Sequence, residues 1–278
     1  MATKAITLDI DGTLTNDRKV ITPRTKEALL AAQDSGIKLI LSSGRPVQGL
    51  RAIASELQLE THDGLLVAFN GAHVVDAQTD EVLFDQPMEE EVLRALVAHM
   101  RGFDVIPWIT EGKYLFVERG ARHLITYREA PFDIVEYERR MCDLELVEVD
   151  DLLEVCSRPQ DKLLCASEPE YLQQHWRAMY EPFFDSLSGM FTADFYFEFM
   201  APGITKGNAL AGALPKVGID ASEVIAFGDA QNDISMLEWA GMGVAMGNAT
   251  EAAKAAADMV TGSNNEDGIA SALEKILG

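Results

Sequence analysis

The sequence is short of basic residues. It has 23 Lys and Arg against 45 Asp and Glu, a formal net charge of −22 over 278 residues. A nucleic-acid-binding protein needs a surplus of positive charge to displace counterions from phosphates, and an anionic membrane surface repels a chain of this charge. We therefore expect neither nucleic acid nor a membrane as a partner. An anionic small molecule would need a local group of positive charges.

Cysteine and long apolar runs are also scarce. Cys142, Cys156 and Cys165 are odd in number and form no CxxC pair, so we expect buried, reduced thiols. The N-terminus, Met1-Ala2-Thr3-Lys4, shows no secretory leader pattern, and no run approaches the length of a membrane span. These absences predict a cytoplasmic protein, in which the glycosylation pattern at Asn248 would have no use.

Strand and helix patterns alternate at both ends of the chain. Apolar strand-like runs occupy 5–8, 37–41 and 65–69, with helical patterns between Thr22 and Gly36 and over 47–57. Towards the C-terminus, helical patterns cover 206–214, 231–240, 251–257 and 268–277, and strand-like runs cover 224–227, 243–246 and 259–260. This alternation predicts an α/β domain with a parallel sheet and right-handed crossovers.

The middle of the chain breaks the alternation. It is richer in aromatic and acidic residues, with strand-like runs at 105–110 and 114–117 and helical patterns at 89–100 and 169–180. We predict that residues 86–189 form an α+β domain inserted into a core made of residues 1–85 and 190–278.

The first motif, Asp9-Ile10-Asp11-Gly12-Thr13, follows the first predicted strand. Ligands of open α/β sheets bind at the carboxyl ends of the strands. Residues two apart on a strand share a face, so Asp9 and Asp11 can point into one site. Two carboxylates this close both stay ionised only beside a cation or hydrogen-bond donors, which suits a hard divalent cation. The simpler alternative is a pair of solvated acids around a turn glycine.

A second acidic motif, Gly228-Asp229-Ala230-Gln231-Asn232-Asp233, follows another predicted strand and opens a helix. Acidic residues alone are common at helix N-termini. Together with Asp9 and Asp11, however, the motif places four carboxylates at one edge of the sheet. That much uncompensated charge implies a metal.

Two further segments suit a phosphate. Ser43 and Gly44 end the second predicted strand, where a hydroxyl and backbone N–H groups can bind a phosphate oxygen, although an ordinary serine N-cap is the simpler interpretation. Lys206 lies just inside a predicted helix start, where it opposes the helix dipole. This position suggests a phosphate or aspartate partner, and the alternative is a solvated surface lysine.

In this order and spacing, the four segments resemble those of the haloacid dehalogenase (HAD) superfamily of phosphotransferases. The insertion, with Ser43-Gly44-Arg45-Pro46 and Asn70-Gly71, resembles the Cof-type subfamily with a type IIB (C2B) cap. The resemblance covers nearly the whole chain. It implies a Rossmann-like core and a cap domain that closes over the site. Ser43 and Ala230 depart from the threonine and glycine of many relatives.

The resemblance also implies a role for each motif residue. Asp9 would be the nucleophile that forms an aspartyl-phosphate, and Asp11 the general acid and then the base. The groups that bind the phosphoryl oxygens would be Ser43, Lys206, Asn232 and the backbone N–H groups of Ile10 and Gly44. The metal would be Mg²⁺, bound by Asp9, the Asp11 carbonyl and Asp229, with Asp233 orienting Lys206 or a bound water.

The expected function is therefore Mg²⁺-dependent hydrolysis of small phosphate monoesters, with sugar phosphates as the first class, by a monomer or weak homodimer. One alternative is a phosphosugar mutase, which would need a bisphosphate activator and release no inorganic phosphate. Another is a phospho-ligand sensor without turnover. The pair Asp9 and Asp11 argues against a sensor, because a sensor needs no acid or base.

Overall fold

The computed structural model describes residues 2–278, which form two compact units. The first unit contains the chain up to Asp85 together with Thr205–Gly278, and the second is Gln86–Ile204. The boundary expected after residue 189 is wrong. Strands β12 (Ser188–Ala193) and β13 (Tyr196–Met200) hydrogen-bond into the sheet of the second unit, so the chain leaves that unit only after them.

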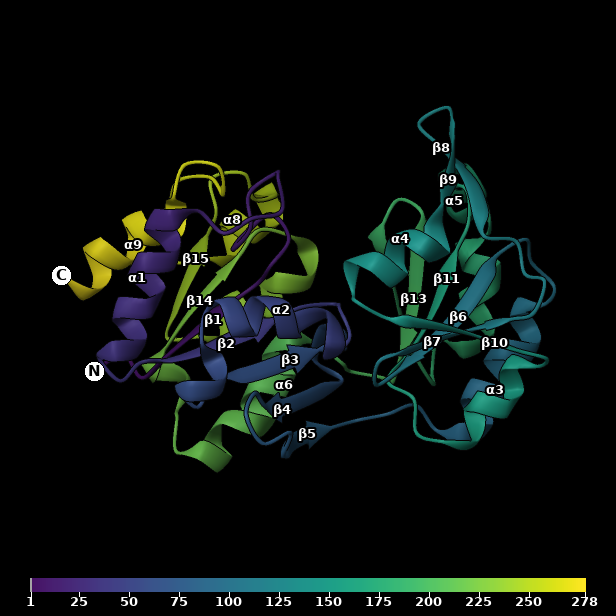
Figure 1. Cartoon of the computed structure of the whole chain (residues 1–278), viewed down its shortest axis with the longest axis horizontal. Coiled ribbons are helices and arrows are strands. Elements are labelled where there is room, and N and C mark those ends of the chain that lie inside the picture. Colours follow the sequence, from purple (N-terminus) through teal and green to yellow (C-terminus); the bar gives the residue numbers. More distant parts are fainter. Residues whose placement is uncertain (1) are drawn as a thin grey trace. The chain divides into compact units, whose positions relative to one another are not determined.

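The first unit is built on an eight-stranded sheet in the order β16-β15-β14-β1-β2-β3-β4-β5 (Figure 1). Its parallel strands are β1 (Ala5–Leu8), β2 (Lys38–Ser42), β3 (Leu65–Ala68), β14 (Val224–Gly228), β15 (Met242–Ala245) and β16 (Met259–Val260). At one edge, β4 (His73–Asp76) and β5 (Val82–Asp85) pair antiparallel. The parallel α/β sheet that the alternation predicts is confirmed, as is the Rossmann-like core that the resemblance implies.

Six α-helices accompany the parallel strands in the described part of the first unit. They are α1 (Pro23–Asp34), α2 (Gln48–Glu56), α6 (Lys206–Ala213), α7 (Ile234–Trp239), α8 (Glu251–Ala256) and α9 (Gly268–Leu277). Figure 1 shows α1 and α9 side by side, in agreement with their contacts. Every residue of β1 and β14 is buried, as expected for parallel strands covered on both faces.

The helix predicted over 231–240 is divided in the structure. A 3₁₀ turn, Gln231–Asp233, precedes α7. The Asp233 carboxylate accepts hydrogen bonds from the N–H groups of Asp229 at 2.8 Å and Ala230 at 2.9 Å. These bonds hold the residues before α7 against the loop after β14. The first turn is therefore a 3₁₀ turn, and the α-helix begins only at Ile234.

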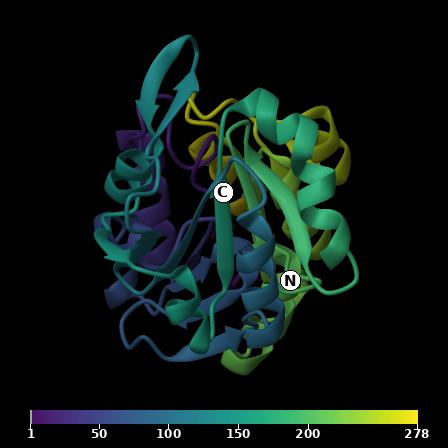
Figure 2. The ribbon, with the colours of Figure 1, turned by 90° about the vertical axis from the view of Figure 1, so that its right-hand side faces the viewer.

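The inserted unit holds a six-stranded sheet in the order β10-β7-β6-β11-β13-β12. The remaining strands of this sheet are β6 (Ile106–Glu111), β7 (Tyr114–Glu118), β10 (Glu145–Val149) and β11 (Lys162–Ala166). Its helices are α3 (Glu90–Met100), α4 (Ile134–Met141) and α5 (Pro169–Tyr180). Strands β8 (Leu124–Tyr127) and β9 (Ala130–Asp133) form a separate ribbon, teal at the top of Figure 2. The predicted α+β character of the insertion is confirmed.

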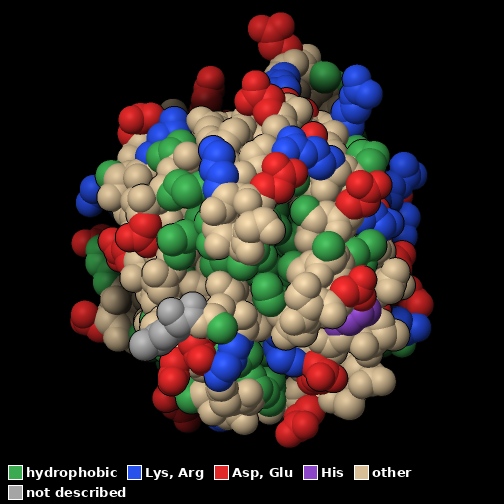
Figure 3. Space-filling view, turned by 90° about the vertical axis from the view of Figure 1, so that its left-hand side faces the viewer, with side chains coloured by type: hydrophobic (Ala, Val, Ile, Leu, Met, Phe, Trp, Pro, Cys, Tyr) green, Lys and Arg blue, Asp and Glu red, His purple; other side chains and the backbone are tan. Residues whose placement is uncertain are grey.

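Three features of the structure relate to the expectations for the thiols, for membranes and for the surface charge. The three cysteines are free and buried. Within residues 2–278, the helices lack the combined length and apolar character that crossing a bilayer requires. On the face drawn in Figure 3, acidic and basic side chains are interspersed, so the excess negative charge is not gathered into one patch on that face.

A buried ion pair lies inside the inserted unit. Lys162 on β11 donates to Glu198 on β13 over 2.8 Å, and the two side chains are 6% and 4% exposed. Glu138 of α4 is buried nearby and accepts a hydrogen bond from the Tyr196 hydroxyl at 3.1 Å. Burial raises the pKa of Glu138, and the charge of Lys162 opposes that rise. The lysine thus compensates carboxylates that cannot reach water.

We expect Lys162→Met to destabilise the protein by about 3–5 kcal/mol, because it leaves a buried carboxylate without its counter-charge. Lys113→Met is the matched control, since Lys113 pairs with Glu145 at 2.7 Å on the surface of the same unit. Exposed pairs contribute little. Urea unfolding followed by circular dichroism measures both variants, and equal midpoints for the two would contradict the prediction.

Candidate active site

Three neighbouring strands end at the same edge of the core sheet. Asp9 follows β1, Ser43 follows β2 and Asp229 follows β14. Strand β1 lies between the other two, and the last residue of β1, Leu8, is in register with Leu41 and Phe227. The chain therefore leaves the sheet at one level in all three places, and the motifs are brought together.

Lys206 connects two of these motifs. It is the first residue of α6, its side chain is fully buried, and its Nζ donates to Asp9 Oδ1 at 2.6 Å and Asp233 Oδ1 at 2.7 Å. Gly71 allows α6 to start here, because a Cβ at Gly71 would lie 2.4 Å from the Thr205 carbonyl oxygen. Lys206 is thus a buried ion-pair partner, and the alternative of a solvated lysine is wrong.

The charges of this group do not balance. Burial, and next the negative charge of Asp233, raises the pKa of Asp9 even though Lys206 opposes the shift. Burial also raises the pKa of Asp229 to about 6, against the hydrogen bond from Thr13. Burial by itself disfavours the Lys206 ammonium, but Asp233 and Asp9 raise its pKa above the usual range. Three carboxyl groups therefore share one ammonium, and a further cation would offset the excess.

The residues fit a divalent cation. Asp9, Asp229 and Asp233 each offer a carboxylate oxygen, and the three atoms lie within 4.8 Å of one another. Asp233 is already engaged, by Lys206 on Oδ1 and by two backbone N–H groups on Oδ2. Asp229 Oδ1 accepts a hydrogen bond from the Thr13 hydroxyl at 2.6 Å. The hydrogen bonds of Asp9 and Asp229 thus use Oδ1, and Oδ2 of each carboxylate can serve as a metal ligand. Such oxygen donors suit a hard divalent cation.

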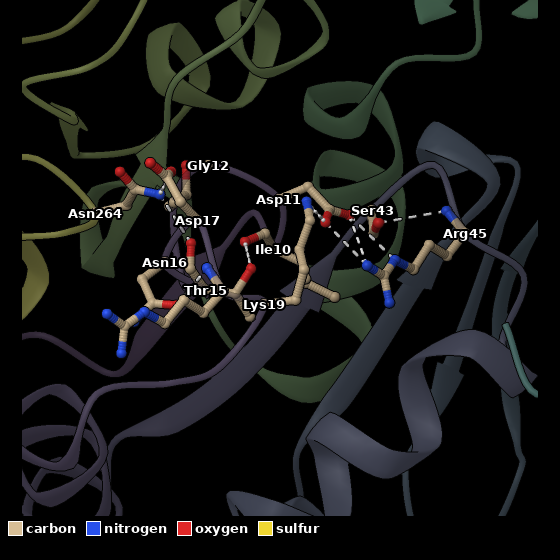
Figure 4. A network of polar contacts seen from close by, with 12 residues as sticks. Ile10, Asp11, Gly12, Thr15, Asn16, Asp17, Lys19, Ser43, Arg45 and Asn264 are labelled. Atoms are coloured by element: carbon tan, nitrogen blue, oxygen red, sulfur yellow. Dashed lines mark hydrogen bonds and ion pairs between the residues drawn. The ribbon is translucent and has the colours of Figure 1, made fainter. Parts of the chain in front are cut away.

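Asp11 has a different environment from Asp9. Its carboxylate is 40% exposed and lies against Arg45 and Lys19 (Figure 4). Arg45 Nε donates to Oδ2 at 3.1 Å, Arg45 Nη2 lies 2.9 Å from both oxygens, and Lys19 Nζ donates to Oδ1 at 2.7 Å. Burial would raise the pKa of Asp11, but the two cations lower it below its usual value.

Ser43 and Asn232 are joined through Asn70. The Ser43 carbonyl accepts the N–H of Asn70 at 2.9 Å, and Asn70 Oδ1 accepts a hydrogen bond from Asn232 Nδ2 at 3.0 Å. Asn70 is 1% exposed and adopts a left-handed backbone with φ of 56°. Gly44 lies close beside it, since a Cβ at Gly44 would be 3.1 Å from Asn70 Nδ2. The last of the five residues expected near the phosphate, Ile10, is fully buried directly after Asp9.

Sequence reasoning missed several residues that support this group. Thr13 and Asn70 stand in sequence motifs, but the motifs assign them no role, and nothing in the sequence points to Lys19. Asn248, which had only matched a glycosylation pattern, donates from Nδ2 to the Gly12 carbonyl at 2.8 Å. Each of these residues acts through a contact made by loop folding, which no motif spacing encodes.

Comparison with known proteins decides the family. The model of haloacid dehalogenase-like hydrolases matches residues 6–273. The chain is a haloacid dehalogenase-like hydrolase. Among curated proteins, it is 30% identical to the putative phosphatase YxeH of Bacillus subtilis, over 99% of this chain and 98% of that protein. The HAD membership expected from the four motifs is confirmed, and the chain is a hydrolase that acts on phosphate esters.

Solved structures agree with this assignment. A haloacid dehalogenase-like hydrolase from Bacteroides thetaiotaomicron superposes with a TM-score of 0.89 at 32% identity, covering 99% of each chain. The HAD subclass IIB sugar phosphatase BT4131 superposes with a TM-score of 0.81 at 27% identity, covering 98% of each chain. A relative named for a different substrate, the pyridoxal phosphate phosphatase YbhA of Escherichia coli, is 28% identical over 97% of each chain.

We expect Gly12→Ala to reduce phosphate release strongly. A Cβ at Gly12 would lie 2.5 Å from Asp229 Oδ2, so Asp229 must move. The control is Gly36→Ala, which has a similar positive φ, +88° against +90°, but meets no atom within 4 Å. The backbone strain lowers stability by about 1–2 kcal/mol in both variants. Parallel unfolding and activity assays test this, and equal activity in the two would refute a role for the Asp229 position.

Proposed function

We propose that this HAD hydrolase cleaves small phosphorylated metabolites, sugar phosphates first, with Asp9 as the nucleophile and Mg²⁺ as its metal. The observation that carries the proposal is the buried Lys206 ammonium between Asp9 and Asp233, 2.6 and 2.7 Å from their oxygens. It supplies a fixed positive charge beside a carboxylate at a strand end. A chain of net charge −22 needs such a charge to accept a phosphate dianion.

The proposed reaction has two steps. A carboxylate oxygen of Asp9 attacks phosphorus, the bond from phosphorus to the leaving oxygen breaks, and Asp11 gives that oxygen a proton. Water then attacks the phosphorus of the aspartyl-phosphate. The proton of the water passes to Asp11, and the electron pair of the breaking P–O bond returns to the Asp9 carboxylate.

Phosphoryl transfer depends chiefly on positioning and on stabilising the charge of the phosphoryl oxygens. The proposed donors are Lys206, Ser43 and Asn232, with the backbone N–H groups of Ile10 and Gly44. The contacts of Asn70 with the Ser43 carbonyl and the Asn232 amide support this assignment. Donors that are already held in place need little reorganisation during the reaction.

For the metal we propose Asp9, Asp229 and the Asp11 carbonyl as ligands, with Asp233 behind them holding Lys206. When bound, Mg²⁺ would neutralise charge on the phosphoryl group. The oxygen-only donor set and the raised pKa values of Asp9 and Asp229 support this choice. Asp233 is occupied by its own hydrogen bonds, which favours the supporting role.

The substrate class rests on similarity. BT4131, named a sugar phosphatase, is 27% identical to this chain, and YbhA, named a pyridoxal phosphate phosphatase, is 28% identical. We therefore place hexose and pentose phosphates first in the assay panel and pyridoxal phosphate second.

We expect Asp9→Asn to abolish phosphate release from the whole panel without unfolding the protein. The folded metal-free protein disfavours the ionised Asp9, because burial raises the pKa of this group above its unfolded value of 3.8. At neutral pH Asp9 ionises freely only in the unfolded chain, so it lowers the stability of the metal-free fold, and asparagine removes that penalty while still accepting the bond from Lys206. The melting temperature of the metal-free variant should equal or exceed that of the wild type.

Asp34→Asn is the control, because it makes the same substitution at an exposed carboxylate of the core. Retained metal-dependent turnover in a folded Asp9→Asn variant would refute the nucleophile. Release of inorganic phosphate without a bisphosphate activator separates the phosphatase from a mutase, and any Asp9-dependent turnover excludes a sensor.

Metal binding should weaken as pH falls. The cation takes the ionised carboxylates, while the raised pKa values of Asp9 and Asp229, about 6 for Asp229, allow protons to compete. We expect calorimetric Mg²⁺ affinity to fall by roughly tenfold or more between pH 7.5 and 5, because each pH unit below a controlling pKa lowers it about tenfold. Asp229→Asn should bind Mg²⁺ weakly at both values, and pH-independent affinity in the wild type would contradict this ligand set.

A further inference from the structure

The Asp11 carboxylate is fixed by two cationic side chains from two different loops. Arg45 approaches it side-on through Nε and Nη2, and Lys19 binds Oδ1 (Figure 4). The Arg45 side chain is 15% exposed although its partner is 40% exposed. Each Asp11 oxygen is contacted by two donor nitrogens: Oδ1 by Lys19 Nζ and Arg45 Nη2, and Oδ2 by Arg45 Nε and Nη2. These contacts fix the plane of the carboxylate as well as its position.

Arg45 is itself held on the backbone. Its N–H donates to Ser43 Oγ at 3.3 Å, and its carbonyl accepts the N–H of Phe69 at 3.0 Å. The residue that contacts Asp11 through its side chain thus touches Ser43 through its main chain. One arginine links the proposed acid and base to the proposed phosphate-binding serine.

Lys19 is carried to Asp11 by a closed turn. Its N–H donates to the Asn16 carbonyl at 2.8 Å, and the Asn16 N–H donates to the Val20 carbonyl at 3.0 Å. Asn264 fastens the start of this turn by donating to the Thr15 carbonyl at 3.0 Å. Lys19 has a left-handed backbone with φ of 59°, so the turn itself directs the side chain.

We propose that Arg45 and Lys19 are positioning residues that orient the Asp11 carboxylate for the second step, in which it takes a proton from the attacking water. The proposal rests on the proposed function for the role of Asp11. Bidentate arginine contacts fix geometry as well as charge. Without Arg45, the carboxylate keeps only Lys19, on one oxygen, and turns away from the direction in which it must accept the proton.

The second step can be isolated with p-nitrophenyl phosphate. Its leaving group departs without a proton, so formation of the aspartyl-phosphate needs no acid, whereas hydrolysis of the intermediate still needs the base. Misplacing Asp11 should therefore slow breakdown and leave formation intact. The resulting signature is a burst of nitrophenolate followed by slow turnover.

We expect Arg45→Ala to lower the steady-state kcat about 10- to 100-fold, a part of the roughly 10²- to 10⁴-fold that acid–base catalysis supplies. The burst should approach one nitrophenolate per active site, and acid quenching should trap a protein heavier by one phosphoryl group. Arg45→Lys and Lys19→Met should show smaller losses with the same burst. Asp11→Asn is the positive control, and Arg24→Ala, which removes an exposed arginine paired with Glu274, is the negative control.

Three results would overturn the proposal: unchanged kinetics in all three variants, a raised KM without a burst, or additive losses in Arg45→Ala/Asp11→Asn. Additive losses would mean that Arg45 acts directly on the substrate and not through Asp11. If Arg45→Ala fails to fold, Arg45→Lys and Lys19→Met decide the question. Turnover by Asp9→Asn, or no effect of Asp11→Asn, would instead indicate that the proposed function is wrong.

Discussion

The bridge from Lys206 to Asp9 and Asp233 is the interaction on which the rest of the site depends. It joins the end of β1, the start of α6 and the loop after β14, which are far apart in the sequence. A buried ammonium is stable only beside its counter-charges, so the three segments must meet in one arrangement. Asp233 extends the bridge, because its second oxygen holds the loop that carries Asp229.

This bridge also answers the question raised by the charge of the chain. The sequence has few cations, yet Lys206, Arg45 and Lys19 all approach the carboxylates that follow β1. The net charge of −22 therefore says little about the field at this edge of the sheet. Charge that is fixed at short range outweighs screened charge spread over a surface.

The core could be predicted from the sequence, and much of the inserted unit could not. Strands β1 and β14 are short, fully buried and mostly apolar, and the motifs that begin at Asp9 and Asp229 follow them directly. Strand β10, by contrast, mixes two glutamates with three apolar residues and has no buried residue. It pairs in parallel with β7, so its place depends on a distant strand. Likewise Asn70 and Lys19 lie at left-handed positions in loops. The contacts of their side chains depend on how those loops fold, which the sequence pattern does not indicate.

Asp9 and Asp11 illustrate how two nearby carboxylates come to differ. They are separated by one residue, but Asp9 is buried against Lys206 and other carboxyls, whereas Asp11 is half exposed between two cations. The environment raises the pKa of the first and lowers that of the second. The lowered pKa keeps Asp11 ionised, which suits the base proposed for the second step, whereas an ionised Asp9 needs a further cation to offset its burial. The separation arises from backbone geometry, because the sheet edge fixes Asp9 while the loops after β1 and β2 bring the cations to Asp11.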